Sequence, residues 1–282
     1  MMMNENIISY FPGHMAKGIK DLKKAIKSVD LIAEIIDARA PSSSKNSDFE
    51  KIILNKPKIL ILNKCDLAND FFTFQWLEFY NSKQNYAMKL NCKSNKNLND
   101  FFKLVNLAMK NNQVAKNAKI MVIGIPNVGK SSFINRLIGK NRAKVENKTG
   151  VTRGVQWFSL KNGIEILDTA GILTPKFDDS ETALNLSLIG SIKNEILDSE
   201  ELAIKLIEKI KANYSGNIAE RYAVEQKKIL SLEPCEILGY IANKRNMLLR
   251  NGEIDRGRVS TMFLKEFKSG KLGKITLEMV CK

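Results

Sequence analysis

Short apolar runs alternate with amphipathic stretches over the first two thirds of the chain. The runs at 31–37, 58–62, 86–90, 120–123 and 164–167 are rich in Ile, Leu and Val, and each predicts a buried strand. Between them, apolar residues recur at helical spacing at about 70–82, 97–112 and 130–139. This alternation predicts an α/β fold, with a mostly parallel sheet and helices on both of its faces.

Helical periodicity also marks the two ends of the chain. Residues 14–28 predict an amphipathic basic helix, with apolar side chains on one face and lysines on the other. From 181 to 281 the pattern is helical throughout, with turns expected at 213–216, 233–234, 251–252 and 269–270. The strand signals stop near residue 182, which predicts two domains: a domain at 1–182 that carries the sheet and the basic helix, and an all-helical domain at 183–282.

Composition narrows the class of protein. Of the 282 residues 44% are hydrophobic and 27% are charged, as in soluble globular proteins. No apolar run approaches the ~20 residues that cross a bilayer, and polar residues interrupt the N-terminal segment, so we expect neither membrane span nor signal peptide. The 4 cysteines lie far apart without a CxxC pair, which favours a reducing cytoplasm and argues against a zinc site or disulfides.

The net charge of +15 is unevenly distributed. Residues 101–160 hold eleven basic side chains and one acid, and residues 241–282 hold ten and four. Residues 161–240 instead hold nine basic side chains and fourteen acids. A lysine-rich genome bias would raise Lys everywhere, whereas this clustering indicates a polyanionic partner, with nucleic acid favoured over a membrane.

The segment from Gly124 to Ser131 reads GIPNVGKS and fits the phosphate-binding pattern G-x4-G-K-S. It follows a predicted strand and opens a predicted helix, the context in which backbone N–H groups cradle a polyphosphate. Lys130 would reach the β- and γ-phosphates, and the Ser131 hydroxyl would bind Mg²⁺. The expected nucleotide contacts here come from Asn127, Val128, Gly129, Lys130, Ser131 and Ser132.

Two further segments complete the phosphate end of the expected site. Asp168 begins the sequence Asp-Thr-Ala-Gly at a strand end, where its carboxylate suits a water-mediated Mg²⁺ contact and the Gly171 N–H suits the γ-phosphate. The polar stretch 149–153 holds two threonines that could bind Mg²⁺, and we favour Thr152 over Thr149.

A base-recognition motif, Asn63-Lys64-Cys65-Asp66, ends the predicted strand 58–62. The Asp66 carboxylate can accept hydrogen bonds from both N1–H and the N2 amino group of guanine, a pair of donors that adenine lacks. Asn63 can bond the purine or brace the phosphate loop, and the Lys64 stem can lie over the ring. The motif therefore predicts GTP rather than ATP.

The guanine motif precedes the phosphate loop in the chain, the reverse of an ordinary GTPase, and this order predicts a circular permutation. The chain resembles the circularly permuted GTPases that assist ribosome assembly, in particular the ribosome biogenesis GTPase A (YlqF) family. The resemblance spans about residues 6–280, and its motifs are 10–17, Asp37-Ala-Arg39, 63–66, 124–131 and 168–177.

The resemblance adds expectations about catalysis. Ile172 stands where many GTPases carry a water-orienting glutamine, and the family's proposed substitute is the single histidine, His14, which would orient or polarise the attacking water. The residues alone leave open that His14 only caps the basic helix. Asn127 resembles the K⁺ ligand of K⁺-stimulated GTPases, and a purely structural contact of Asn127 within the loop stays open as the alternative. Further base contacts would come from Asn91, Cys92 and Lys93.

The resemblance also implies a biological task. It implies a monomeric GTPase, slow alone, that binds a late precursor of the large ribosomal subunit, promotes its maturation and leaves after GTP hydrolysis. Contacts to rRNA phosphates are expected from Arg250, Arg256, Arg258, Lys265, Lys268, Lys271 and Lys274. Two alternatives stay open: another RNA-directed GTPase, in tRNA modification or translation, and an RNA-binding scaffold that binds GTP but barely hydrolyses it.

Overall fold

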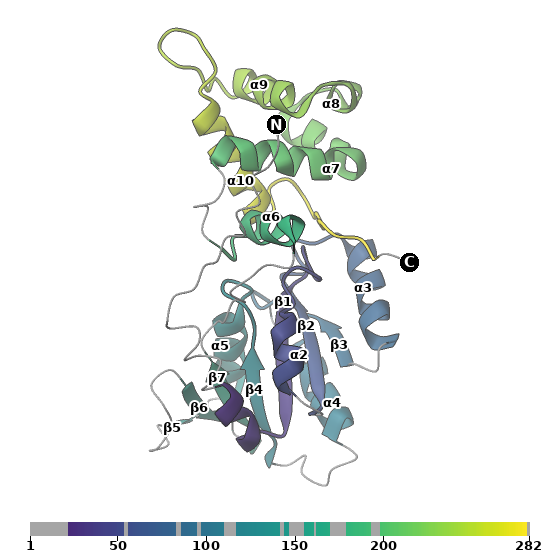
Figure 1. The fold of residues 1–282 in the computed structure, drawn as a ribbon, viewed down its shortest axis with the longest axis vertical. Coiled ribbons are helices and arrows are strands. Elements are labelled where there is room, and N and C mark those ends of the chain that lie inside the picture. Colours follow the sequence, from purple (N-terminus) through teal and green to yellow (C-terminus); the bar gives the residue numbers. More distant parts are fainter. Residues whose placement is uncertain are drawn as a thin grey trace.

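A seven-stranded sheet organises the first part of the chain, in the spatial order β3-β2-β1-β4-β7-β6-β5 (Figure 1). The computed structural model describes residues 22–53, 56–82, 86–94, 97–109, 117–141, 144–146, 155–160, 162–169, 179–192 and 198–280. The strands are β1 (Leu31–Asp37), β2 (Lys58–Asn63), β3 (Tyr86–Lys89), β4 (Lys119–Ile123), β5 (Lys144–Glu146), β6 (Val155–Ser159) and β7 (Glu165–Thr169).

The sheet is mostly parallel, which confirms the predicted fold class. The strands β3, β2, β1, β4 and β7 pair in parallel. At one side of the sheet, β6 pairs antiparallel with both β7 and the edge strand β5. All five strands predicted from apolar runs are present, within two residues of the expected bounds. The strands β5, at one edge of the sheet, and its neighbour β6 were not predicted, because β5 has only 3 residues and β6 mixes polar with aromatic residues.

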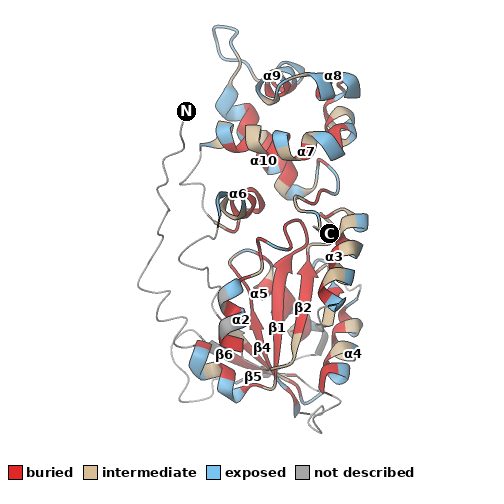
Figure 2. Cartoon of the chain, turned by 45° about the vertical axis from the view of Figure 1, so that its right-hand side comes forward, coloured by how far each residue is buried: buried red, intermediate tan, exposed pale blue. Residues whose placement is uncertain are grey.

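Alternate side chains of the strands pack into two apolar cores, one on each face of the sheet. Leu31, Ala33 and Ile35 of β1 share a core with α4 (Leu98–Met109) and α5 (Lys130–Asn141) on one face. Ile32 faces the opposite side, where residues 22–29 and α2 (Ser47–Ile53) cover the sheet. On that side α3 (Asp70–Ser82) covers β2. Figure 2 shows β1 and β2 buried between these layers, as the sequence predicted.

Two short helical segments cover the sheet near the start of the described chain: the end of the basic helix and α2. The 14–28 helix is described only from residue 22, where a helical turn continues into a 3₁₀ turn at Ile26–Ser28. Leu22 and Ile26 are buried, as the amphipathic pattern requires. The helix α2 was not predicted, because its 7 residues are too few for a clear periodicity.

In the described residues after the sheet, the helices are α6 (Ser180–Ile189), α7 (Ser199–Tyr222), α8 (Gln226–Ser231), α9 (Pro234–Lys244) and α10 (Arg256–Ser269). Leu206, Ile210 and Phe263 are among the residues of their shared core. The turn expected at 213–216 is wrong, since α7 runs through it and only kinks at Tyr214, where φ is −131°. The other three turns lie between helices or end α10, as predicted.

The helical region docks at the carboxyl ends of β1 and β2, with α6 between the sheet and the other helices (Figures 1 and 2). Leu186 and Ile189 of α6 join the sheet core, whereas Leu188 joins the helical core. The last described segment, 275–280, returns to the sheet domain, and the Leu277 N–H donates to the Arg39 carbonyl at 2.7 Å. The domain boundary near residue 182 stays a prediction.

Candidate nucleotide-binding site

The predicted site segments meet at one edge of the sheet. Strands β2, β1, β4 and β7 are neighbours and run in parallel, so their carboxyl ends lie side by side. Asn63 is the last residue of β2, Gly124 directly follows β4, and Asp168 is the next-to-last residue of β7. The fold thereby joins a base motif and a phosphate loop that are far apart in the chain.

The phosphate loop carries a buried lysine at the start of α5. Lys130 is 9% exposed, and its Nζ lies 2.9 Å from Asp168 Oδ1 and also donates to the Thr169 carbonyl. Ser131 and Ser132 are exposed on the first turn of the same helix. The structure therefore brings Lys130 together with Asp168, and the hydroxyls of Ser131 and Ser132 directly follow Lys130 in the chain.

Gly129 is the position where the phosphate loop meets the base motif. Its φ of 101° lies in the left-handed region, and a Cβ there would lie 2.1 Å from Asn63 Nδ2. This close approach exists because Asn63 Nδ2 donates to the Val128 carbonyl at 2.8 Å. Any side chain at 129 would separate the two loops, so the glycine of the motif is required by contact as well as by backbone conformation.

Asn63 braces the protein rather than presenting a free amide. Its side chain is buried, with Nδ2 on Val128 and Oδ1 accepting from the Cys92 N–H at 3.3 Å. Of the two roles left open for Asn63, the structure shows the bracing one. The same bond holds the loop of Asn91, Cys92 and Lys93 beside the base motif.

Arg136 was not among the predicted site residues. From α5 it donates to the Cys92 carbonyl through Nε at 3.1 Å and Nη2 at 2.9 Å. It thus fixes the 91–93 loop, whose Asn91 side chain accepts from the Lys93 N–H at 2.8 Å. Helical spacing in α5 gave no sign of this contact, because the partner is a backbone carbonyl on another element.

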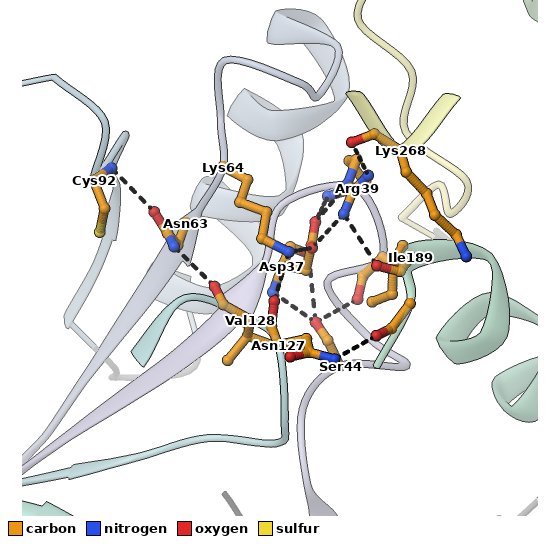
Figure 3. A network of polar contacts seen from close by, with 12 residues as sticks. Asp37, Arg39, Ser44, Asn63, Lys64, Cys92, Asn127, Val128, Ile189 and Lys268 are labelled. Atoms are coloured by element: carbon orange, nitrogen blue, oxygen red, sulfur yellow. Dashed lines mark hydrogen bonds and ion pairs between the residues drawn. The ribbon is translucent and has the colours of Figure 1, made fainter. Parts of the chain in front are cut away.

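Lys64 connects the base motif to the phosphate loop a second time (Figure 3). Its Nζ donates to the Asn127 carbonyl at 2.6 Å and lies 2.8 Å from Asp37 Oδ2. Its φ of 59° starts the turn that presents Cys65 and Asp66, both only partly buried. Asp66 therefore remains partly accessible two residues after the fixed Lys64.

A fully buried ion pair underlies this turn. Asp37 is 0% exposed and accepts from Arg39 Nε at 2.9 Å and Nη2 at 2.8 Å, in addition to Lys64. Burial alone would raise the pKa of Asp37, but the Arg39 and Lys64 charges outweigh it and hold the pKa at about 2. Asp37 and Arg39 belong to a motif of the resembled family, and the sequence alone predicts no role for them.

The depressed pKa predicts how stability depends on pH. An aspartate titrates near pH ~4 in the unfolded chain, so the Asp37 contribution is complete above that value and is lost as the pH falls towards 2. The shift corresponds to about 2 kcal/mol of unfolding free energy. Urea unfolding between pH 2 and pH 5 should show wild type losing about 2 kcal/mol more than Asp37→Asn; parallel curves would contradict the assignment.

Three predicted site residues lie outside the described part of the chain, and the seven expected RNA contacts belong to the helical region. His14, Thr152 and Gly171 fall outside the described residues. Of the seven basic residues expected to contact RNA, Lys268 is half-buried and its carbonyl accepts from Arg39. Arg256 pairs with Glu200 at 2.8 Å and Lys274 with Asp70 at 2.6 Å, each remaining about half exposed. The other four are exposed: Arg250, Arg258, Lys265 and Lys271.

The donor set at the phosphate loop fits Mg²⁺, which prefers a few protein oxygens and keeps several waters. Ser131 and Asp168 supply such oxygens, and the Asp168 side chain is 28% exposed. The Asn127 Nδ2 donates to the Gly190 carbonyl at 2.7 Å, which leaves its Oδ1 as the oxygen a K⁺ ion would use. Within the described ranges, no cluster of three His, Cys, Asp or Glu forms a metal site, and no helix has the length and apolar character of a membrane span.

Comparison with known proteins agrees with this geometry. A family model described as a 50S ribosome-binding GTPase matches residues 119–238, beginning at the strand before the phosphate loop. Ribosome biogenesis GTPase A of Bacillus cereus is 35% identical over 280 residues, covering 96% of this chain and 94% of that protein. The Thermotoga maritima protein of the same name is 31% identical, with 96% and 94% covered.

A solved structure supports the same assignment. The crystal structure of GNP-bound YlqF from T. maritima superposes with a TM-score of 0.65 at 27% identity, covering 93% of this chain and 98% of that one. The likeness therefore includes both the sheet domain and the helical region. With the phosphate loop and guanine motif meeting at one sheet edge, the chain belongs to the ribosome biogenesis GTPase A family and is a GTP-hydrolysing enzyme of ribosome biogenesis.

Proposed function

We propose that this GTPase binds a late precursor of the large ribosomal subunit, promotes its maturation and is released on GTP hydrolysis. The observation that carries the proposal is the junction of the Lys130–Asp168 pair with the guanine motif, through Asn63 Nδ2 on the Val128 carbonyl at 2.8 Å. The names of the matched family and relatives support the ribosomal partner.

In this proposal each end of the nucleotide has its own group of residues. Asp66 accepts from the guanine edge, the backbone of 127–132 binds the phosphates, and Lys130 neutralises their charge. Ser131, Thr152 and, through water, Asp168 would hold Mg²⁺, which would neutralise phosphate charge when bound. K⁺ at Asn127 and the Gly171 N–H on the γ-phosphate belong to the same proposal.

We infer that the fold is a circular permutation of a GTPase sheet. The phosphate-loop strand β4 lies at the centre of the sheet, and the base-motif strand β2 lies two places away although it comes earlier in the chain. Because sheet neighbours place the loops, such a cut in chain order leaves the site intact.

The basic helical region is the proposed RNA contact. Exposed basic residues of α10 and its flanking loops can neutralise phosphates without reading sequence. Arg258 and Lys265 lie seven positions apart on α10 and both are exposed, so they share one face of that helix. Lys268 is the exception among the seven candidates, because it is half-buried at the docking interface.

The catalytic role of His14 gives a test of the chemistry. His14→Ala should lower the turnover stimulated by large-subunit particles by about 10²–10⁴-fold, the usual contribution of a group that handles a proton or orients water. The GTP affinity should stay nearly unchanged, because such a group acts in the transition state. Single-turnover hydrolysis and nucleotide titration of both proteins measure the two quantities.

The same assay discriminates the alternatives. A wild-type rate that rises with tRNA or complete ribosomes, but not with large-subunit precursors, would favour another RNA-directed GTPase. Tight particle binding without any rise in rate would favour a scaffold. If His14→Ala keeps the stimulated rate, His14 only supports the basic helix.

A further inference from the structure

Within the buried Asp37–Arg39 ion pair, it is Arg39 that contacts the helical region. Its Nη2 donates to the Ile189 carbonyl at the end of α6, and its Nη1 to the Lys268 carbonyl in α10, each at 3.4 Å. The guanidinium lies over the Phe267 ring at 5.5 Å. The Arg39 carbonyl also accepts from the Leu277 N–H at 2.7 Å. One residue therefore touches α6, α10 and the returning segment 275–280.

The partner of Arg39 leads to the phosphate loop. Asp37 shares its Oδ2 between Arg39 and Lys64, each at 2.8 Å, and Lys64 donates to the Asn127 carbonyl at 2.6 Å. The Asn127 side chain then donates to Gly190, the residue after Ile189. These bonds close a ring that runs from the phosphate loop through Lys64, Asp37 and Arg39 to α6 and back (Figure 3).

The ring is anchored on the buried Asp37–Arg39 ion pair, whereas its bonds from Lys64 and Asn127 lie at the surface. Separating Asp37 from Arg39 would leave an uncompensated charge in the interior, so the ring is either closed or replaced by a different set of contacts. Two members of the ring, Lys64 and Asn127, belong to the loops expected to surround the nucleotide. Movement of either loop on nucleotide binding would therefore change the contacts that hold α6 and α10.

We propose that Arg39 is a positioning residue that couples the state of the nucleotide loops to the docking of α6, α10 and the 275–280 segment. The inference rests on the nucleotide site proposed above. GTP tightens the ring, and the helical region docks more firmly on the sheet domain. By linkage, a particle that binds the docked form raises GTP affinity by the same factor.

Hydrogen–deuterium exchange of the full chain, with and without a non-hydrolysable GTP analogue, tests the coupling. In wild type the analogue should slow amide exchange in 124–132 and also in 180–192 and 256–280. Arg39→Met removes a buried charge and can prevent folding, so Arg39→Lys is the main variant. A lysine keeps a charge for Asp37 but lacks the fork that reaches the Ile189 and Lys268 carbonyls together.

The matched control is Arg221→Lys. Arg221 also forms a bidentate ion pair, with Glu266, and this pair lies inside the helical region and outside the ring. Arg39→Lys should keep the response of 124–132 and lose that of both helical segments, whereas Arg221→Lys keeps all three. A full helical response in Arg39→Lys overturns the coupling, as does a wild type that responds only in 124–132. No response in 124–132 of wild type would instead overturn the nucleotide site itself, and the coupling with it.

Discussion

Replacing Lys130 by Met should lower kcat/KM for GTP by about 10²–10³-fold, the loss seen when one preorganised charge-stabilising donor is removed. Lys130 is the buried cation of the phosphate loop, and its Nζ lies 2.9 Å from Asp168. Methionine keeps the length and the apolar contacts of the stem but removes the charge. Steady-state phosphate release over a range of GTP concentrations measures the effect.

The control for Lys130 is a lysine outside the site. Lys103 on α4 is 77% exposed and pairs with Asp100, one turn away. Lys103→Met should therefore leave kcat/KM unchanged. Equal rates for Lys130→Met and wild type would show that the phosphate loop does not carry the chemistry.

Replacing Asp66 by Ala should lower the preference for GTP over ATP by about 10²-fold or more. The carboxylate is expected to accept two hydrogen bonds from guanine, and a bond to a charged group contributes about 1.5–3 kcal/mol. Asp66 is partly exposed at the turn after β2, so its loss should not unfold the chain. Competition titrations with labelled GTP and unlabelled ATP give both affinities.

Asp70 provides the matched control for Asp66. It lies four residues later, is 62% exposed and pairs with Lys274. Asp70→Ala should retain full selectivity for GTP. An Asp66→Ala protein that still binds GTP with wild-type affinity would refute the guanine assignment.

The sequence predicted the central strands and both nucleotide motifs because their signals are local. The runs behind β1, β2 and β4 are buried on both faces, which produces continuous apolar stretches. The phosphate loop and the base motif each occupy a few consecutive residues at a strand end. Parallel pairing of neighbouring strands then suffices to bring these motifs together.

The sequence could not predict contacts whose partners are distant backbone groups. Arg39 meets the carbonyls of Ile189 and Lys268, and Arg136 meets that of Cys92. A carbonyl acceptor is available at every residue and leaves no mark in the sequence. The antiparallel strands β5 and β6 and the kink at Tyr214 were missed for a related reason, since tertiary packing rather than local periodicity determines them.

Binding to large-subunit precursors in each nucleotide state tests the central claim most directly. Purified precursor particles are sedimented with the full chain in the presence of a non-hydrolysable GTP analogue or GDP, and the bound fraction is titrated. The affinity should be higher with the analogue by about 5–150-fold, the usual range of coupling between two sites. Equal affinity in the two nucleotide states, or equal binding to small-subunit particles, would contradict the account.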